Sequence, residues 1–147
     1  MENLEIYEKV RVVPEEAKKK IGAGRLKGFT DINPMWRIKT LTEQFGACGI
    51  GWYTDVIQSY VLDGSDGQKV QHVDINLYVK VDGEWSKPIF GTGGSMFIAN
   101  ESRGAYTSDE AKKMAYTDAL SVACKSLGIG ADVYWEKDKT KYDEKPE

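Results

Sequence analysis

The stretch that decides the fold runs from Ser108 to Trp135 and reads SDEAKKMAYTDALSVACKSLGIGADVYW. Ser108 is a candidate N-cap residue, and the two acidic residues that follow it place negative charge where a helix dipole is positive. Gly128 and Gly130 can adopt the positive φ angles that end a helix and turn the chain. We therefore predict a helix that begins at Ser108 and ends before Gly128.

This helix is apolar around most of its circumference. At about 100° per residue, one broad arc collects Ala111, Ala115, Tyr116, Ala119, Leu120, Val122, Ala123 and Leu127. A narrow polar stripe opposite it holds Thr117, Asp118, Ser121 and Lys125. The pattern predicts a helix that is buried on more than one side.

Two further helices are expected upstream. Pro14 suits the first turn of a helix that runs through Ile21, with acidic residues near its start and three lysines in its last turn. The pair Asn33-Pro34 supplies an N-cap and an N1 proline for a second helix, which Gly46 ends.

The hydrophobic period then changes to two, which predicts strands over Gly51 to Leu62, Lys69 to Val81 and about Ser86 to Ile98. Residues 63–67 and 81–84 have the composition of turns. Glycines in the stretch Gly91-Thr92-Gly93-Gly94-Ser95 indicate a bulge or a close backbone approach. The order α-α-β-β-β-α predicts an α+β fold, in which helices pack on an antiparallel sheet of three or slightly more strands.

The 147-residue chain is expected to form one domain over residues 1–135, followed by a charged, solvated tail over 136–147. A net charge of −3 provides no global basic field, so any nucleic-acid site must be a local patch. We find no signal-peptide core and no apolar run of the roughly 20 residues that a membrane span needs. Cys48 and Cys124 are expected to be reduced and buried, as in a cytosolic protein.

Four short blocks of sequence, spread over roughly residues 14 to 135, occur in an order that is informative. They are Ile21-Gly22-Ala23-Gly24-Arg25; then Leu41, Phe45-Gly46 and Gly51-Trp52; then Gly91-Thr92-Gly93-Gly94-Ser95; and finally Ala115, Thr117-Asp118-Ala119-Leu120, Ala123, Lys125-Ser126-Leu127-Gly128 and Gly130-Ala131-Asp132-Val133-Tyr134. In these blocks the chain resembles the annealing domain of the Rad fifty-two superfamily of single-strand annealing proteins, which many bacteriophages encode.

The resemblance implies a protein that binds single-stranded DNA and anneals complementary strands without ATP in phage recombination and repair. It also implies a homo-oligomer, either a ring or a helical filament, in which the last helix packs against its own sheet and against a neighbour. A phage exonuclease or a single-strand-binding protein would be further partners, and the place of action would be the cytoplasm of the bacterial host. No catalytic residue, metal or cofactor is expected.

The candidate DNA-binding residues are basic and fall in two regions. Between Lys18 and Lys39 they are Lys18, Lys19, Lys20, Arg25, Lys27, Arg37 and Lys39, with Asp31 as the one acidic residue of that stretch. In or just before the last helix they are Arg103, Lys112, Lys113 and Lys125. Such side chains, together with the amides of a glycine-rich loop, can donate hydrogen bonds to phosphate.

Two of these residues carry specific expectations from the resemblance. Lys19 falls where the family has a basic residue in its DNA groove, and Lys125 lies on the polar stripe of the last helix. The better-known eukaryotic members carry basic residues where this chain has Ser121 and Val122, so one of three helix charges remains. The plain alternative for each lysine is a solvated surface position or an ion pair, such as Lys125 with Asp118.

Other residues favour structural interpretations. The stretch from Gly91 to Ser95 lacks the GK[ST] end of a Walker A loop and favours a strand bend. His72 has no neighbouring ligand in sequence, which argues against a metal site. Trp36 and Tyr106 are candidate base-stacking residues, whereas Trp52 is expected in the core.

The main alternative function is a sequence-independent single-strand-binding protein that protects DNA without annealing it. The usual OB-fold of such proteins needs five strands, and only three are expected here. An enzyme with a small-molecule site beneath the sheet is a third possibility, for which the sequence names no catalytic group.

Overall fold

The computed structural model describes residues 1–137, so most of the expected tail, residues 138–147, lies outside the described part. The helices are α1 (Glu5–Val10), α2 (Pro34–Phe45), α3 (Ala111–Ser126) and α4 (Ala131–Lys137). The strands are β1 (Lys18–Lys20), β2 (Thr30–Ile32), β3 (Trp52–Asp63), β4 (Lys69–Val81), β5 (Glu84–Trp85), β6 (Ile89–Glu101) and β7 (Gly104–Thr107). The predicted α+β class is confirmed.

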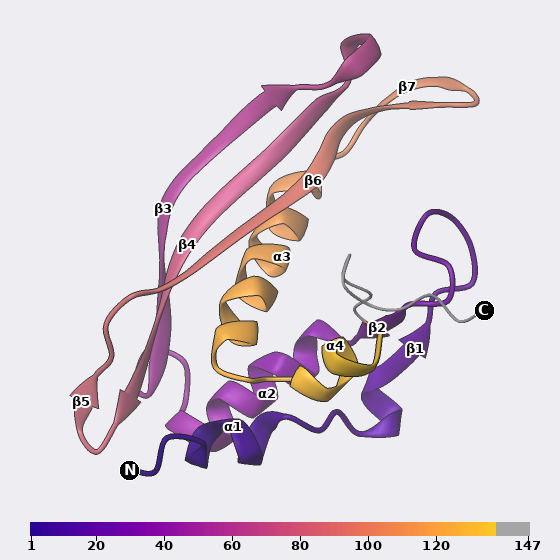
Figure 1. Ribbon diagram of the computed structural model, residues 1–147. Coiled ribbons are helices and arrows are strands. Elements are labelled where there is room, and N and C mark those ends of the chain that lie inside the picture. Colours follow the sequence, from indigo (N-terminus) through magenta and orange to yellow (C-terminus); the bar gives the residue numbers. More distant parts are fainter. Residues whose placement is uncertain (138–147) are drawn as a thin grey trace.

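The main structural element is a long antiparallel sheet. Its strand order is β3-β4-β6-β7, and the short β5 pairs with β4. The strands β1 and β2 form a separate two-stranded sheet. In Figure 1, α3 crosses one face of the long sheet. The helices α1, α2 and α4 and the β1–β2 pair lie around the C-terminal end of α3.

Alternation along β4 places one face of the sheet in the core. The buried side chains of this face are Val73, Ile75, Leu77 and Val79. They share one cluster with three alanines of α3, Ala115, Ala119 and Ala123, which are completely buried. Because the chain's own sheet covers these alanines, any surface that contacts a neighbouring subunit must lie elsewhere.

The contact between β6 and α3 depends on two glycines. A Cβ atom on Gly91 would lie 2.1 Å from the backbone oxygen of Ala119, and one on Gly93 would lie 2.3 Å from the backbone oxygen of Ala115. The helix therefore rests directly on the backbone of the strand. This confirms the predicted close approach, and the glycine stretch is part of a strand.

The expected helix from Pro14 to Ile21 is wrong. Glu15–Ala17 forms a single 3-10 turn, and Lys18–Lys20 then pairs as β1 with β2, with Lys19 opposite Asp31. The physical reason is that this segment has little apolar surface to bury. Ala17 packs into a small second cluster with Val13, Ile32 and Val133, which holds the segment extended.

The order α-α-β-β-β-α is also wrong, because β1, β2, β5, β7, α1 and α4 were not expected. The helix α2 and the long strands agree with expectation; the Asn33 side chain accepts a hydrogen bond from the Met35 amide at 3.0 Å. The helix α3 begins three residues later than predicted. The Ser108 hydroxyl accepts from the Glu110 amide at 3.2 Å and so shapes the turn before the helix.

The long sheet has five strands, whereas an antiparallel sheet of three or slightly more strands was expected. Its strands follow a meander with an open outer edge at β3, which differs from the Greek-key barrel of an OB-fold. None of the helices in residues 1–137 is long and apolar enough to cross a membrane.

Replacing Gly93 with alanine should lower the free energy of unfolding by about 1–3 kcal/mol or more, because the methyl group would overlap the helix backbone. Thermal unfolding followed by circular dichroism measures this. Gly22→Ala is the matched control, since a Cβ there meets nothing within 4 Å. Equal melting temperatures for the two variants would contradict the close contact.

Candidate nucleic-acid interface

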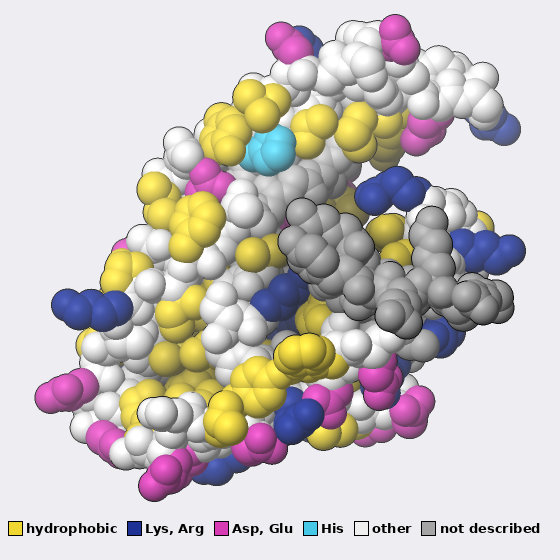
Figure 2. Space-filling model, in the orientation of Figure 1, with side chains coloured by type: hydrophobic (Ala, Val, Ile, Leu, Met, Phe, Trp, Pro, Cys, Tyr) yellow, Lys and Arg dark blue, Asp and Glu magenta, His cyan; other side chains and the backbone are white. Residues whose placement is uncertain are grey.

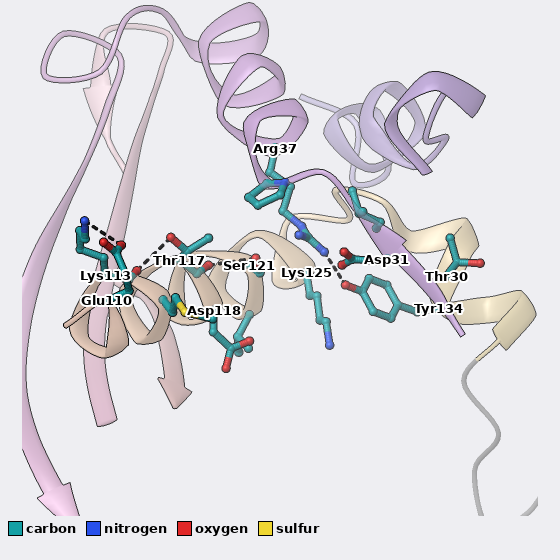
Figure 3. Close-up of a pocket in the computed structure, with 14 residues that line it drawn as sticks. Thr30, Asp31, Arg37, Glu110, Lys113, Thr117, Asp118, Ser121, Lys125 and Tyr134 are labelled. Carbon is teal, nitrogen blue, oxygen red and sulfur yellow. Dashed lines mark hydrogen bonds and ion pairs between the residues drawn. The ribbon is translucent and has the colours of Figure 1, made fainter. Parts of the chain in front are cut away.

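A cleft of about 590 Å³ opens along the exposed side of α3. Its walls come from β2, α2, α3 and α4, which brings together segments about 100 residues apart in sequence. The lining residues include Thr30, Asp31, Arg37, Glu110, Lys113, Thr117, Asp118, Ser121, Lys125 and Tyr134 (Figure 3). The polar stripe predicted from helical periodicity is therefore one wall of a cleft.

A second cavity of about 250 Å³ shares Thr30 with the cleft. It is lined by Glu15, Lys18, Lys19, Lys20, Thr30, Val133 and Glu136. The strand β1 thus places its three lysines next to the cleft. A helix over the same residues would have directed these side chains differently. Figure 2 shows a notch in the molecular surface below the β6–β7 end of the long sheet, with Lys and Arg side chains along its lower rim.

The wall formed by α3 is held by local hydrogen bonds. The Thr117 hydroxyl donates to the Lys113 carbonyl and the Ser121 hydroxyl to the Thr117 carbonyl, each at 3.0 Å. The Asp118 carboxylate accepts from the backbone amide of Gly94 at 3.1 Å, which ties the stripe to β6. The expected alternative of an ion pair between Asp118 and Lys125 is not formed.

Two cations meet at Tyr134. The ammonium group of Lys125 lies 4.2 Å from the centroid of the Tyr134 ring, a cation–π contact. The Arg37 guanidinium donates from Nη2 to the Tyr134 hydroxyl at 2.7 Å. In Figure 3 both side chains reach toward the ring, one from α2 and one from α3.

Arg37 differs from the expectation of an exposed charge. Its residue is only 7% exposed, and its Nε atom is buried without a hydrogen-bond partner in the described structure. Burial raises the pKa of the nearby Cys124 thiol to about 12, although the positive charge of Arg37 opposes this shift. Arg37 therefore carries its charge inside the wall of the cleft.

The other candidate cations divide into two groups. Lys18 pairs with Glu15 at 3.1 Å, and Lys113 pairs with Glu110 at 2.7 Å, which raises the pKa of Lys113. Both belong to the cavity walls, as do Lys19 and Lys20.

The remaining candidates lie outside these walls. They are Arg25 and Lys27 in the exposed loop between β1 and β2, Lys39 on α2, Arg103 in the turn between β6 and β7, and Lys112 beside an apolar cavity at the β3 side of α3. Lys39 pairs with Glu43 at 3.7 Å. The structure therefore brings together six of the eleven predicted cations.

Sequence reasoning missed Tyr134 as a site residue and missed the acidic share of the cleft. Asp31, Glu110 and Asp118 line the cleft beside its three cations, so its wall carries mixed charge. The signal for Tyr134 was the aromatic segment after Gly130, which forms α4. Nothing in that segment alone shows which cations it meets.

The expected aromatic contacts have mixed outcomes. Trp52 lies in the core as predicted, and Tyr106 is about half exposed on β7. Trp36 packs against both hydrophobic clusters and is partly buried, which leaves it less ring surface for a base than expected. His72 stacks on Tyr60, with 5.3 Å between the ring centroids, and residues 1–137 contain no cluster of metal-ligating side chains.

The outer face of the long sheet carries a separate polar cluster around Asp74. Its carboxylate accepts hydrogen bonds at 2.6 Å from the Thr92 hydroxyl and from the Gln58 amide. These bonds lower the pKa of Asp74 despite its burial. Because both carboxylate oxygens have hydrogen-bond partners on neighbouring strands, we interpret this cluster as a structural link between β3, β4 and β6.

No protein-family model matches this chain, and a search of the curated proteins finds no significant match.

The two cysteines should differ sharply in reactivity. Cys48 is exposed, contrary to expectation, whereas Cys124 is buried with its pKa raised to about 12. At pH 8 a maleimide should label one thiol in the folded protein and two after denaturation, as counted by mass spectrometry. Rapid labelling of Cys124 in the folded state would contradict the packing of α3.

Proposed function

We propose that this protein binds single-stranded DNA and anneals complementary strands without ATP, as a member of the phage-type annealing proteins that its sequence resembles. The observation that carries the proposal is the convergence of Arg37, Lys113 and Lys125 on one cleft, next to the three lysines of β1. Of the four blocks behind the resemblance, the last contributes Thr117, Asp118, Lys125 and Tyr134 to the walls of this cleft.

Annealing sets a physical requirement that a mixed-charge cleft can meet. The protein must hold phosphates through cations, while the base edges stay free to pair with a second strand. Lys18 and Lys113 already have carboxylate partners, so their charges are partly offset. Lys19 and Lys125 are therefore the better candidates for contacts with DNA phosphates that hold the strand and can still exchange.

The expected assembly has a candidate surface at the edge of the long sheet. Within residues 1–137, β3 pairs with β4 on one side and makes only an isolated bridge to Cys48 besides. Its apolar side chains Val56, Ile57, Val61 and Leu62 are about half exposed. An open, apolar edge strand favours pairing with another chain, and a head-to-tail contact of this kind builds rings or filaments.

In this proposal the protein acts in the cytoplasm of a bacterial host, where a phage exonuclease would supply single strands. A host or phage single-strand-binding protein would then compete for the same strands.

The decisive experiment mixes the purified protein with complementary oligonucleotides in EDTA and without nucleotide, and follows pairing by fluorescence transfer. The annealing rate should rise well above that of the free strands. Binding should be indifferent to base sequence and should weaken steeply with salt, with a slope of about −0.7 per neutralised phosphate. Tight binding with slowed pairing would instead favour the protective single-strand-binding alternative.

The wall of α3 provides a graded test. Lys125→Ala should weaken binding and annealing, because it removes the exposed cation of the polar stripe. Ser121→Lys should strengthen binding, since it adds a cation to the same cleft one turn away. Both variants should keep the wild-type free energy of unfolding within about 0.5 kcal/mol. Unchanged annealing in both would remove α3 from the DNA site.

The edge of β3 can be tested by Ile57→Lys, because an exposed lysine on an edge strand opposes pairing. Light scattering should show a multimer for the wild type and a smaller species for the variant. Met35→Lys places the same charge at an exposed position of α2 and should leave the assembly unchanged. A wild-type protein that stays monomeric with and without DNA would contradict the annealing assignment.

A further inference from the structure

The guanidinium of Arg37 is the least expected charge in the molecule. It enters the cleft from α2, is more than nine-tenths buried, and leaves its Nε atom without a partner. A buried charge is costly unless it is paired and hydrogen-bonded. Within residues 1–137, its hydrogen-bond partner is the Tyr134 hydroxyl rather than a carboxylate.

Carboxylates of the described residues do not neutralise this charge. The ion pairs of residues 1–137 include neither Arg37 nor Lys125, although Asp31 and Asp118 line the same cleft. Two cations that approach one aromatic ring repel each other. An anion held between them would remove that repulsion and would accept hydrogen bonds from the guanidinium.

We propose that the Arg37 guanidinium, the Tyr134 hydroxyl and the Lys125 ammonium form a subsite for one phosphate group. The inference rests on the proposed function in one respect, namely that the phosphate belongs to the backbone of a bound single strand. Arg37 supplies two donors in a planar fork, which suits the oxygens of a phosphate. Lys125 adds charge from the exposed rim, and Tyr134 is a positioning residue that holds the fork in place.

This assignment separates the buried cation from the exposed ones. Lys19, Arg25 and Lys27 can contact phosphates at varying positions, whereas the Arg37 fork is fixed by Tyr134 and by burial. One phosphate per subunit would therefore be held in register, and the neighbouring nucleotides would be held loosely.

The first test uses inorganic phosphate as the probe. The melting temperature of the wild-type protein should rise by a few degrees in sodium phosphate, relative to sodium chloride of equal ionic strength and pH, because a ligand of the folded state stabilises it. Arg37→Lys and Tyr134→Phe should abolish most of this rise. Lys39→Gln is the matched control, since it removes a charge from the same helix outside the cleft and should keep the full rise.

The second test measures the affinity for a fluorescent oligodeoxythymidylate. Arg37→Lys keeps the charge and loses the fork, so affinity should fall about tenfold while the salt slope stays unchanged. Arg37→Gln should lose affinity and about 0.7 of the slope. Tyr134→Phe retains the ring and both charges and should weaken binding about threefold; it carries the test if the Arg37 variants fail to fold.

The outcomes distinguish this subsite from the proposed function. If Arg37→Lys and Tyr134→Phe match the wild type with both probes, the subsite is wrong, and annealing by the wild type still decides the function. If phosphate stabilises the wild type through Arg37 but no oligonucleotide binds, the subsite stands for a free phosphate and the proposed function fails. A wild type that responds to neither probe overturns both.

Discussion

The contact between two glycines of β6 and the backbone of α3 is the constraint on which the rest of the structure depends. Because Gly91 and Gly93 let the helix rest on the strand, the small face of α3 is fully covered by the sheet. The opposite face then points away from the sheet and carries Ser121 and Lys125, while Asp118 lies at its border and accepts a hydrogen bond from the Gly94 amide of β6. Which face of α3 lines the candidate site therefore depends on Gly91 and Gly93, although the strand β6 that carries them does not line the cleft.

The second wall of the cleft depends on how the chain returns after α3. Gly130 donates its amide to the carbonyl of Val10 at 2.9 Å, and Asp132 pairs with Arg11 at 2.7 Å. These contacts dock α4 beside the N-terminal segment and bring Tyr134 to Arg37. Packing of Val133 in the second cluster holds the same segment next to β2. The cleft thus lies where the segment from Thr30 to Arg37 meets α3 and α4.

The charge pattern of this junction limits what it can hold. Its cations are nearly matched by carboxylates, which agrees with an acidic protein whose net charge is −3. Such a surface gives little long-range attraction to a polyanion, so in the proposed function affinity would have to come from close contacts and from repetition along an assembly. A single subunit with this cleft would be a weak ligand for DNA, and an array of subunits would not. In the proposed assembly, the open edge of β3 would provide the contact between subunits.

The sequence by itself determined the elements that follow from local rules. Capping predicted α2, the period of two predicted the long strands, the alanine arc predicted a buried α3, and the glycines of residues 91–95 predicted a bulge or a close backbone approach, because each of these signals lies within one segment. The tertiary structure alone decided that Lys18–Lys20 would be a strand, since its partner β2 is separated from it by a loop. It also decided that Arg37 would be buried and would donate a hydrogen bond to Tyr134, which lies 97 residues further along the chain. Burial and pairing across such distances depend on which surfaces the whole chain covers, and no periodicity within a segment records that.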